Sequence, residues 1–286
     1  MTMNKDNMFI QCVSGIGACF ILAVTYVSSL YVWTVRYREP RDHPATIRRR
    51  FISAFCMLFV SPLFVWISIN QDVLNKVGLL QIMGLRLSGS FSALIFPAIL
   101  TVILFAGPLA VLVYDGMFFL IFNKRYLTLC LRSLHWQRNY AVAPLSEEFT
   151  FRACMMPILS QFMSTKIAIL VCPWFFGVAH LHHLMDKISN GCNMAEAVTV
   201  SCIQCGYTSL FGLYSAFLFA RTGHFLAPFI AHVICNFMGF PDFVGVLSRK
   251  DGMKGVFICV YIAGFVFWCM LLFPLTNPAL YDWQWD

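Results

Sequence analysis

The residues best suited to chemistry lie in the stretch 146–152, Ser-Glu-Glu-Phe-Thr-Phe-Arg, at the head of an apolar segment. Ionised groups at membrane depth cost roughly 2.5–3.5 kcal/mol each on insertion scales, so they are rare without a partner or a function. On a helix, Glu148 and Arg152 lie about 40° apart and can form an ion pair. Glu147 points about 140° away from Arg152. Glu147 is therefore the carboxylate without a partner and the candidate catalytic group.

Three polar side chains further along the chain could join Glu147. His180 ends an apolar segment, and His232 and Asn236 are four residues apart, so they share one face of a helix. A carboxylate in an apolar cavity can act as a general base toward water, assisted by a histidine. An Asn amide and a second His can donate hydrogen bonds to a developing oxyanion. This set suits amide hydrolysis by water, with Glu148 and Arg152 as a supporting ion pair.

Other interpretations of these residues remain open. His232 and Asn236 could simply form hydrogen bonds between membrane helices, which are common. Two Glu and two His could bind zinc, although the H-E-x-x-H pattern of zinc proteases is absent. Cys202 and Cys205 form a C-x-x-C that stands alone in an apolar helix and gives weak support to a metal or redox site. We expect no metal and no other cofactor.

The composition predicts an all-α, polytopic membrane protein. The chain of 286 residues is 59% hydrophobic and 12% charged, and several apolar runs exceed the roughly 20 residues that a membrane helix needs. The net charge of +7 is typical of cytoplasmic loops, so it does not indicate nucleic-acid binding. We expect the lipid bilayer as the partner and a single membrane-embedded domain, 1–286, with the catalytic core helices at 140–242.

The apolar runs predict eight transmembrane helices, at Phe9–Val35, Phe51–Ile69, Phe91–Phe122, Ala141–Met163, Ile167–His180, Ala195–Ala220, Phe225–Met238 and Val256–Phe273. With a luminal N-terminus, the loops after the odd-numbered segments carry 14 Lys and Arg residues and the other side carries 5. Basic loops stay in the cytoplasm. Both termini are therefore expected in the lumen, and the polar residues of the fourth, fifth and seventh segments are expected to meet in an intramembrane cavity open to the cytoplasm.

Three further segments carry structural predictions. Pro97 and the pair Gly107-Pro108 should kink or tilt the long third apolar run. The mixed segment Val73–Ser88 is either an interfacial amphipathic helix or an ordinary structured loop. The C-terminal residues 281–286, Tyr-Asp-Trp-Gln-Trp-Asp, are typical of an aromatic anchor at the membrane interface.

Five phrases of the sequence resemble the type II CAAX prenyl endopeptidases, also called Ras-converting endopeptidases, of the ABI or CPBP group of membrane proteases. The phrases are Ser-Glu-Glu-Phe-Thr-Phe-Arg-Ala-Cys-Met-Met-Pro (146–157), Phe-Phe-Gly-Val-Ala-His-Leu-His-His (175–183), Tyr-Thr-Ser-Leu-Phe-Gly-Leu-Tyr (207–214), Arg-Thr-Gly-His (221–224) and His-Val-Ile-Cys-Asn-Phe-Met-Gly-Phe-Pro (232–241). They cover about residues 144–242, roughly a third of the chain. Their order along the chain supports the resemblance more strongly than E-E-x-x-x-R alone.

The resemblance implies an eight-helix protease of the endoplasmic reticulum membrane with its active site facing the cytoplasm. Its substrates would be farnesylated or geranylgeranylated CAAX proteins such as small GTPases, Ras among them, from which it removes the last three residues. Carried over to this sequence, Glu147 and His180 would activate the water, and His232 and Asn236 would form the oxyanion hole. The other hypotheses are a zinc protease and a non-catalytic scaffold that keeps the fold.

Overall fold

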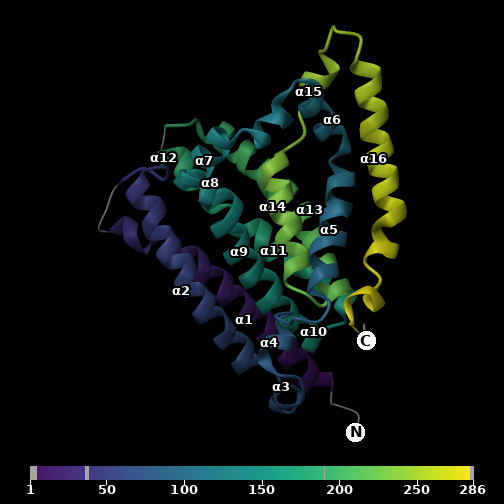
Figure 1. Ribbon diagram of the computed structural model, residues 1–286. Coiled ribbons are helices and arrows are strands. Elements are labelled where there is room, and N and C mark those ends of the chain that lie inside the picture. Colours follow the sequence, from purple (N-terminus) through teal and green to yellow (C-terminus); the bar gives the residue numbers. More distant parts are fainter. Residues whose placement is uncertain (1–4, 36–38, 190, 284–286) are drawn as a thin grey trace.

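The computed structural model describes residues 5–35, 39–189 and 191–283. Within these ranges every regular element is a helix (Figure 1), which confirms the all-α prediction. Part of the predicted aromatic anchor, residues 284–286, lies outside the described residues.

The elements include α-helices, short 3₁₀ turns (η1, η2 and η5) and two π-helical segments (η3 and η4). In chain order they are α1 (Lys5–Tyr31), η1 (Val32–Val35), α2 (Pro44–Ser68), α3 (Gln71–Val77), α4 (Leu79–Ile82), α5 (Ser90–Leu104), α6 (Ala106–Tyr114), η2 (Met117–Phe122), α7 (Lys124–Arg132), α8 (Leu134–Gln137), η3 (Arg138–Val142), α9 (Ala143–Glu148), η4 (Phe149–Cys154), α10 (Met155–Phe162), α11 (Thr165–Ala179), α12 (His182–Ser189), α13 (Met194–Thr222), α14 (Leu226–Met238), α15 (Phe243–Leu247), α16 (Lys254–Leu275) and η5 (Pro278–Tyr281).

Among the described residues, five helical stretches are long and apolar enough to cross a membrane. They are Val13–Tyr31 in α1, α2, Thr165–Ile188 in α11 and α12, α13, and α16. A sixth results if α5 and α6 count as one bent span. The multi-pass helical character is therefore confirmed, while the number eight stays a prediction, because the fourth segment is built of shorter pieces and α14 is short.

The third predicted segment is bent next to Gly107-Pro108, as this pair suggested, whereas Pro97 lies inside α5 without interrupting it. Its two helices, α5 and α6, meet at Phe105 and are inclined by 72°. Gly107 allows α6 to lie against α16, because a Cβ at this position would come within 2.2 Å of the Tyr261 ring. The segment Val73–Ser88 forms the two short helices α3 and α4 with turns around them, so it is not one continuous amphipathic helix.

The helices form a bundle in which α11 packs closely against α13. Helices α1 and α2 pack together on one side, and α5 contacts α14 and α16 on the other (Figure 1). The larger apolar core joins α1, α2, η4, α10, α11 and α13, and a smaller one lies between α5, α13, α14 and η5. The motif segment η4 thus lies within the larger core.

Two glycines bring α11 and α13 close together near the motif. A Cβ on Gly177 would lie 2.0 Å from the Ser209 hydroxyl oxygen. A Cβ on Gly212 would lie 3.2 Å from Nη2 of Arg152 and 3.1 Å from Cβ of Pro173. Small residues at such positions are the usual means by which membrane helices approach each other closely. The close contact fixes the C-terminal end of α11, where His180 lies, relative to α13.

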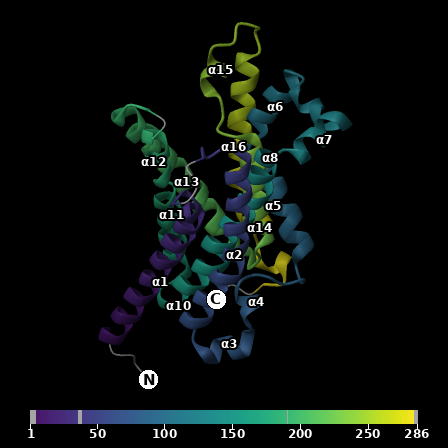
Figure 2. The ribbon, with the colours of Figure 1, turned by 90° about the vertical axis from the view of Figure 1, so that its left-hand side faces the viewer.

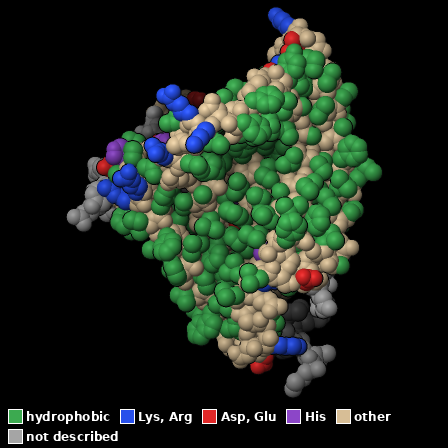
Figure 3. Space-filling model, in the orientation of Figure 1, with side chains coloured by type: hydrophobic (Ala, Val, Ile, Leu, Met, Phe, Trp, Pro, Cys, Tyr) green, Lys and Arg blue, Asp and Glu red, His purple; other side chains and the backbone are tan. Residues whose placement is uncertain are grey.

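The short connecting helices divide between the two ends of the bundle. Helices α7, α8, α12 and α15 lie at one end, whereas α3, α4 and both termini lie at the other (Figures 1 and 2). On the face in Figure 3, Lys and Arg side chains gather mostly at the end that holds α7 and α12, and hydrophobic side chains cover the middle. The loops predicted to share one side of the bilayer therefore share one end of the molecule.

Candidate active site

Glu147 and Glu148 close α9, in an unbroken helical run from α8 to α10 that contains both π-helical segments. Each of these segments is followed within three residues by a proline, Pro144 after η3 and Pro157 after η4. A proline lacks the backbone N–H and its ring presses on the preceding turn, so a wider turn accommodates it. Such π-turns occur frequently at functional sites because they redirect side chains.

Glu148 is fully buried and has three polar partners. Its Oε1 accepts a hydrogen bond from Nη1 of Arg152 at 3.1 Å and lies 2.6 Å from Nδ1 of His232. Its Oε2 accepts a hydrogen bond from the Ser215 hydroxyl at 2.5 Å. The predicted Glu148–Arg152 pair is therefore present. A buried charge without such partners would be strongly destabilising.

Arg152 is also fully buried, and its guanidinium lies between aromatic rings. Its guanidinium carbon is 4.2 Å from the centre of the Phe176 ring and 5.7 Å from that of Phe211. Both distances are suitable for cation–π attraction. The interaction compensates in part for Nε and Nη2, which have no hydrogen-bond partner among the described residues.

His232 lies between the two carboxylates, with one ring nitrogen facing each. Nδ1 faces Glu148 at 2.6 Å, and Nε2 is 3.8 Å from Oε2 of Glu147. With Glu148 ionised, Nδ1 must carry a proton and donate it, which fixes the orientation of the ring. The Phe211 ring, 4.6 Å away between ring centres, holds the imidazole from the side. His232 therefore presents Nε2 to Glu147.

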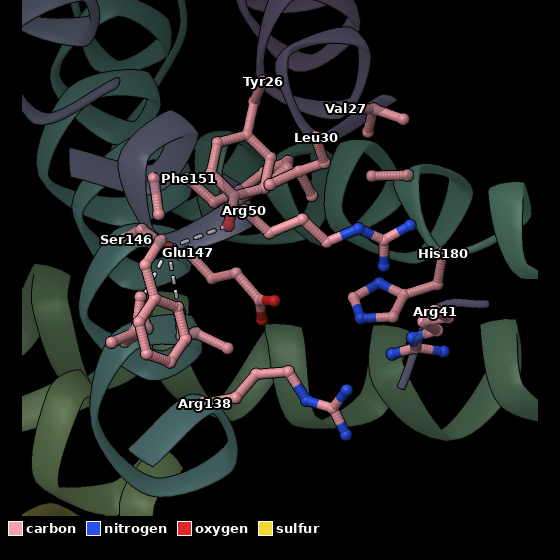
Figure 4. A pocket seen from close by; sticks show the side chains of 15 residues that line it. Tyr26, Val27, Leu30, Arg41, Arg50, Arg138, Ser146, Glu147, Phe151 and His180 are labelled. Carbon is pink, nitrogen blue, oxygen red and sulfur yellow. Dashed lines mark hydrogen bonds between the residues drawn. The ribbon is translucent and has the colours of Figure 1, made fainter. Parts of the chain in front are cut away.

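Glu147 and His180 line one cavity of about 90 Å³, and both side chains point into it (Figure 4). The Glu147 side chain is 19% exposed, in contrast to the enclosed Glu148. Nδ1 of His180 lies 2.7 Å from the Phe176 carbonyl oxygen. Because a carbonyl can only accept, this Nδ1 carries a proton, and in the neutral form of the ring the lone pair is on Nε2. A cavity of this size holds a few water molecules.

The cavity is framed by α1, α2, η3, α9 and the end of α11. Its lining residues are Tyr26, Val27, Leu30, Arg41, Arg50, Phe51, Ala54, Arg138, Val142, Ala143, Ser146, Glu147, Phe151, Ala179 and His180. The side chains that α1 and α2 contribute are mostly apolar but include Arg50, and the other charged groups lie along the rest of the cavity (Figure 4). This combination suits a substrate that has both a lipid and a peptide part.

Asn236 lies one turn beyond His232 on α14 and is exposed. Its side-chain nitrogen donates a hydrogen bond to the carbonyl oxygen of Asn139, at 2.9 Å. It does not line the cavity of Glu147 and His180. The structure thus brings Glu147, His180 and His232 together, and it places Asn236 beside them on the helix with its amide turned to the backbone of η3.

Several residues of this site were not found from the sequence. Ser215 gave no signal, because Ser and Thr hydroxyls in apolar helices commonly bond to their own backbone. Tyr26 is separated from the motif by 120 residues, yet its hydroxyl lies 2.9 Å from that of Ser146. Among the described residues, no group of three or more His, Cys, Asp and Glu side chains is arranged to hold a metal ion. The side chains of His182 and His183 lie outside the described part.

Comparison with known proteins agrees with the arrangement of these motifs. Residues 129–238 match the family model "Type II CAAX prenyl endopeptidase Rce1-like". The chain is 40% identical over 280 residues to "CAAX prenyl protease 2" of Homo sapiens, covering 94% of this chain and 83% of the relative. It is 32% identical over 302 residues to "CAAX prenyl protease 2" of Arabidopsis thaliana, covering 98% and 95%.

A relative at greater distance, "CAAX prenyl protease 2" of Saccharomyces cerevisiae, is 26% identical over 252 residues, covering 77% of this chain and 78% of the relative. No solved structure matches the chain. The similarity to the human and plant relatives extends over nearly the whole chain, well beyond the motif region, and confirms the resemblance found in the motifs. The chain belongs to the CAAX prenyl protease 2 family.

Proposed function

We propose that this protein is an intramembrane endopeptidase that removes the last three residues from farnesylated or geranylgeranylated CAAX proteins, such as small GTPases. The observation that carries the proposal is the meeting of Glu147 and His180 in one cavity, with His232 3.8 Å from Glu147. Family membership supports the substrate class, because the relatives are named CAAX prenyl proteases. The apolar side chains beside the polar groups provide a surface for a prenyl chain.

In the proposed reaction, a water molecule lies between Glu147 and His180. Glu147 takes one proton from this water, and Nε2 of His180 accepts a hydrogen bond from its other hydrogen. The water oxygen bonds to the carbonyl carbon of the prenylated cysteine, and the C–N bond to the next residue breaks. The proton on Glu147 passes to the leaving amine, which also takes up the second proton of the water when the new carboxyl group ionises. The products are a new carboxylate on the cysteine and a free tripeptide. General base catalysis of this kind contributes about 10²–10⁴-fold.

His232 and Asn236 would stabilise the oxyanion. Donation from Nε2 of His232 requires a proton on both ring nitrogens, and the Glu148 carboxylate at Nδ1 balances the charge of that imidazolium. The exposed Asn236 amide would give up its hydrogen bond to the Asn139 carbonyl oxygen and donate to the oxyanion instead. Glu148, Arg152 and Ser215 would position His232 without touching the substrate.

We propose further that the reaction is glutamate-type and metal-independent. Both oxygens of Glu148 and Nδ1 of His232 are engaged by protein partners, so the hydrogen bonds of the site already use these potential ligands. A zinc protease would instead require three protein ligands around the ion.

For the membrane arrangement we propose eight crossings within a single domain, with 140–242 as the catalytic core, in the endoplasmic reticulum membrane. The gathering of α7, α8, α12 and α15 at one end supports the alternation of the segments (Figures 1 and 2). The excess of Lys and Arg in these loops supports a cytoplasmic position for that end, toward which the cavity would open.

A tripeptide-release assay in membranes tests the proposal, with a farnesylated CAAX peptide and its unprenylated counterpart as substrates. Release should require the prenyl group and should be lost in His180→Ala and in His232→Ala at unchanged protein abundance. The control is His135→Ala, since the His135 side chain is 52% exposed and lies outside the cavity. Full activity of His180→Ala, or equal cleavage of the unprenylated peptide, would overturn the assignment. Loss of activity with a strong chelator and recovery with zinc would favour the zinc protease.

A further inference from the structure

Three arginines line the cavity that contains Glu147, and they are not used by the proposed mechanism. Arg41 precedes α2, Arg50 lies in α2, and Arg138 begins η3. Their guanidinium groups lie around the space in front of the Glu147 carboxylate (Figure 4). The charged lining residues are thus three cations and one carboxylate, together with His180. A cavity with this excess of positive charge attracts an anionic ligand.

The immediate contacts of Arg50 and Arg138 show how these cations are held. The guanidinium carbon of Arg50 lies 5.0 Å from the centre of the Tyr31 ring, and its buried Nε has no hydrogen-bond partner among the described residues. Nη1 of Arg138 donates to the largely exposed carboxylate of Asp42 at 2.7 Å. A guanidinium presents five donors in a planar fork that fits a carboxylate, so the Arg50 side chain, which lines the cavity, suits this ligand.

The substrate of the proposed reaction carries one carboxylate at a fixed place, the C-terminal one, three residues beyond the bond that is cut. We propose that Arg50 and Arg138 bind this carboxylate and thereby fix the position of the cut relative to the chain end. This inference rests on the proposed function and adds to it the residues that determine where the enzyme cuts.

The spacing along the helix agrees with this role. Arg138 precedes Glu147 by nine residues on one unbroken helical run, which corresponds to at most about 13 Å along the axis, because the π-helical η3 rises less per residue than an α-helix. Three residues of extended peptide span about 10 Å. A guanidinium at the end of a long, flexible side chain can bridge the remaining difference. A peptide bond placed at Glu147 therefore puts the terminal carboxylate within reach of Arg138.

The apolar side chains of the cavity would bind the prenyl end of the substrate. Val27 and Leu30 of α1 and Phe51 of α2 line the cavity. A prenyl group there and a carboxylate at the arginines would hold the peptide at both ends, with the bond to be cut between them. Binding at two points restricts the peptide to one register, which is how an enzyme positions a reacting group.

The test compares two farnesylated CAAX peptides, one with a free C-terminal carboxylate and one with a C-terminal amide, and the full-length protein in membranes. For the wild type, kcat/KM should be at least about tenfold higher for the acid than for the amide, as expected for charge-assisted hydrogen bonds. Arg50→Gln and Arg138→Gln should bring the acid-to-amide ratio toward one, mainly by raising KM for the acid. Arg138→Lys, which keeps the charge, should retain part of the preference.

The matched control is Arg48→Gln. Arg48 lies in α2, like Arg50, but it is exposed and does not line the cavity. Its acid-to-amide ratio should equal that of the wild type. Equal cleavage of both peptides by the wild type would overturn the inference while leaving the proposed function intact. So would an equal loss with both peptides in the arginine variants, which would indicate binding of anionic lipid or a role in folding. Failure of the wild type to cleave either peptide would instead contradict the proposed function.

Discussion

The two adjacent glutamates have different surroundings, and this difference supports the roles proposed for them. Glu148 is enclosed and engaged by Arg152, Ser215 and His232. Glu147 faces a cavity that is large enough for water and is also lined by His180. A carboxylate held by three partners is poorly placed to move a proton, whereas one in a small cavity can do so. We therefore propose a supporting role for Glu148 and proton transfer for Glu147.

Replacing Glu148 should destabilise the protein severely. In Glu148→Ala the fully buried Arg152 would keep its charge and lose its ion-pair partner, a change that costs about 3–5 kcal/mol in comparable buried pairs. The midpoint of thermal unfolding of the purified protein in detergent should fall accordingly. The control is Glu39→Ala, whose partly exposed carboxylate pairs with Arg49 at 2.6 Å and should contribute about 1 kcal/mol or less. Equal midpoints for the two variants would contradict the assignment.

At this scale the sequence predicted only part of the site. Helical spacing correctly paired Glu148 with Arg152, because residues four apart on a helix are neighbours. It could not show that Nδ1 of His232 faces Glu148, since that contact joins residues 84 positions apart. The π-helical segment that follows Glu148 also has no signature beyond a later proline, Pro157, and it alters the directions of side chains from those of a regular helix.

At the scale of elements, the close packing of α11 against α13 determines where His180 lies. The proposed role of His180 requires that the end of α11 is held in a fixed position relative to the rest of the site. Gly177 and Ser209 provide this contact three residues before His180. The helix pair therefore controls the geometry of the cavity from a position outside it.

Gly177→Ala should reduce both activity and stability. The new Cβ would lie 2.0 Å from the hydroxyl oxygen of Ser209, and overpacking of this kind costs about 1–3 kcal/mol. The double variant Gly177→Ala/Ser209→Ala should recover part of the loss because it removes the clashing oxygen. Gly206→Ala is the control, since its Cβ would meet nothing within 4 Å. Tripeptide release and thermal midpoints measure all three, and a fully active single variant would contradict the role of this contact.

The sequence predicted the elements better than their details. Every predicted apolar segment contains helix, and the bend of the third segment was correctly expected from Gly107-Pro108. Hydrophobicity predicts well where helices occur, but it does not predict where they are interrupted, as at Phe105 between α5 and α6. Nor did it distinguish helix from loop in Val73–Ser88, where polar and apolar residues alternate irregularly and the chain forms two short helices.

At the scale of the whole molecule, the polar ends and the apolar middle match the layers of a bilayer (Figure 3). Charged loops lie at the end that holds α7, α8, α12 and α15, and the termini lie at the opposite end (Figures 1 and 2). The loop order follows the alternation expected from the sequence. The sidedness that we propose rests on the excess of basic residues in those loops.

Labelling of single cysteines should establish this sidedness. In sealed microsomes that expose their cytoplasmic face, a membrane-impermeant maleimide should label the exposed Cys192 in a variant whose other cysteines are replaced. A cysteine placed at Gln71, at the opposite end of the bundle, should be labelled only after the membrane is permeabilised. The reverse pattern would show that the cavity opens to the lumen.

The central claim is that Glu147 is the base that activates water, and the rate of tripeptide release by Glu147→Gln tests it most directly. This variant keeps the size of the side chain and removes its ability to accept the proton. The account predicts that single-turnover release from a farnesylated peptide, normalised to the amount of folded protein, falls by about a hundredfold or more while the thermal midpoint stays close to that of the wild type. Release at the wild-type rate would contradict it.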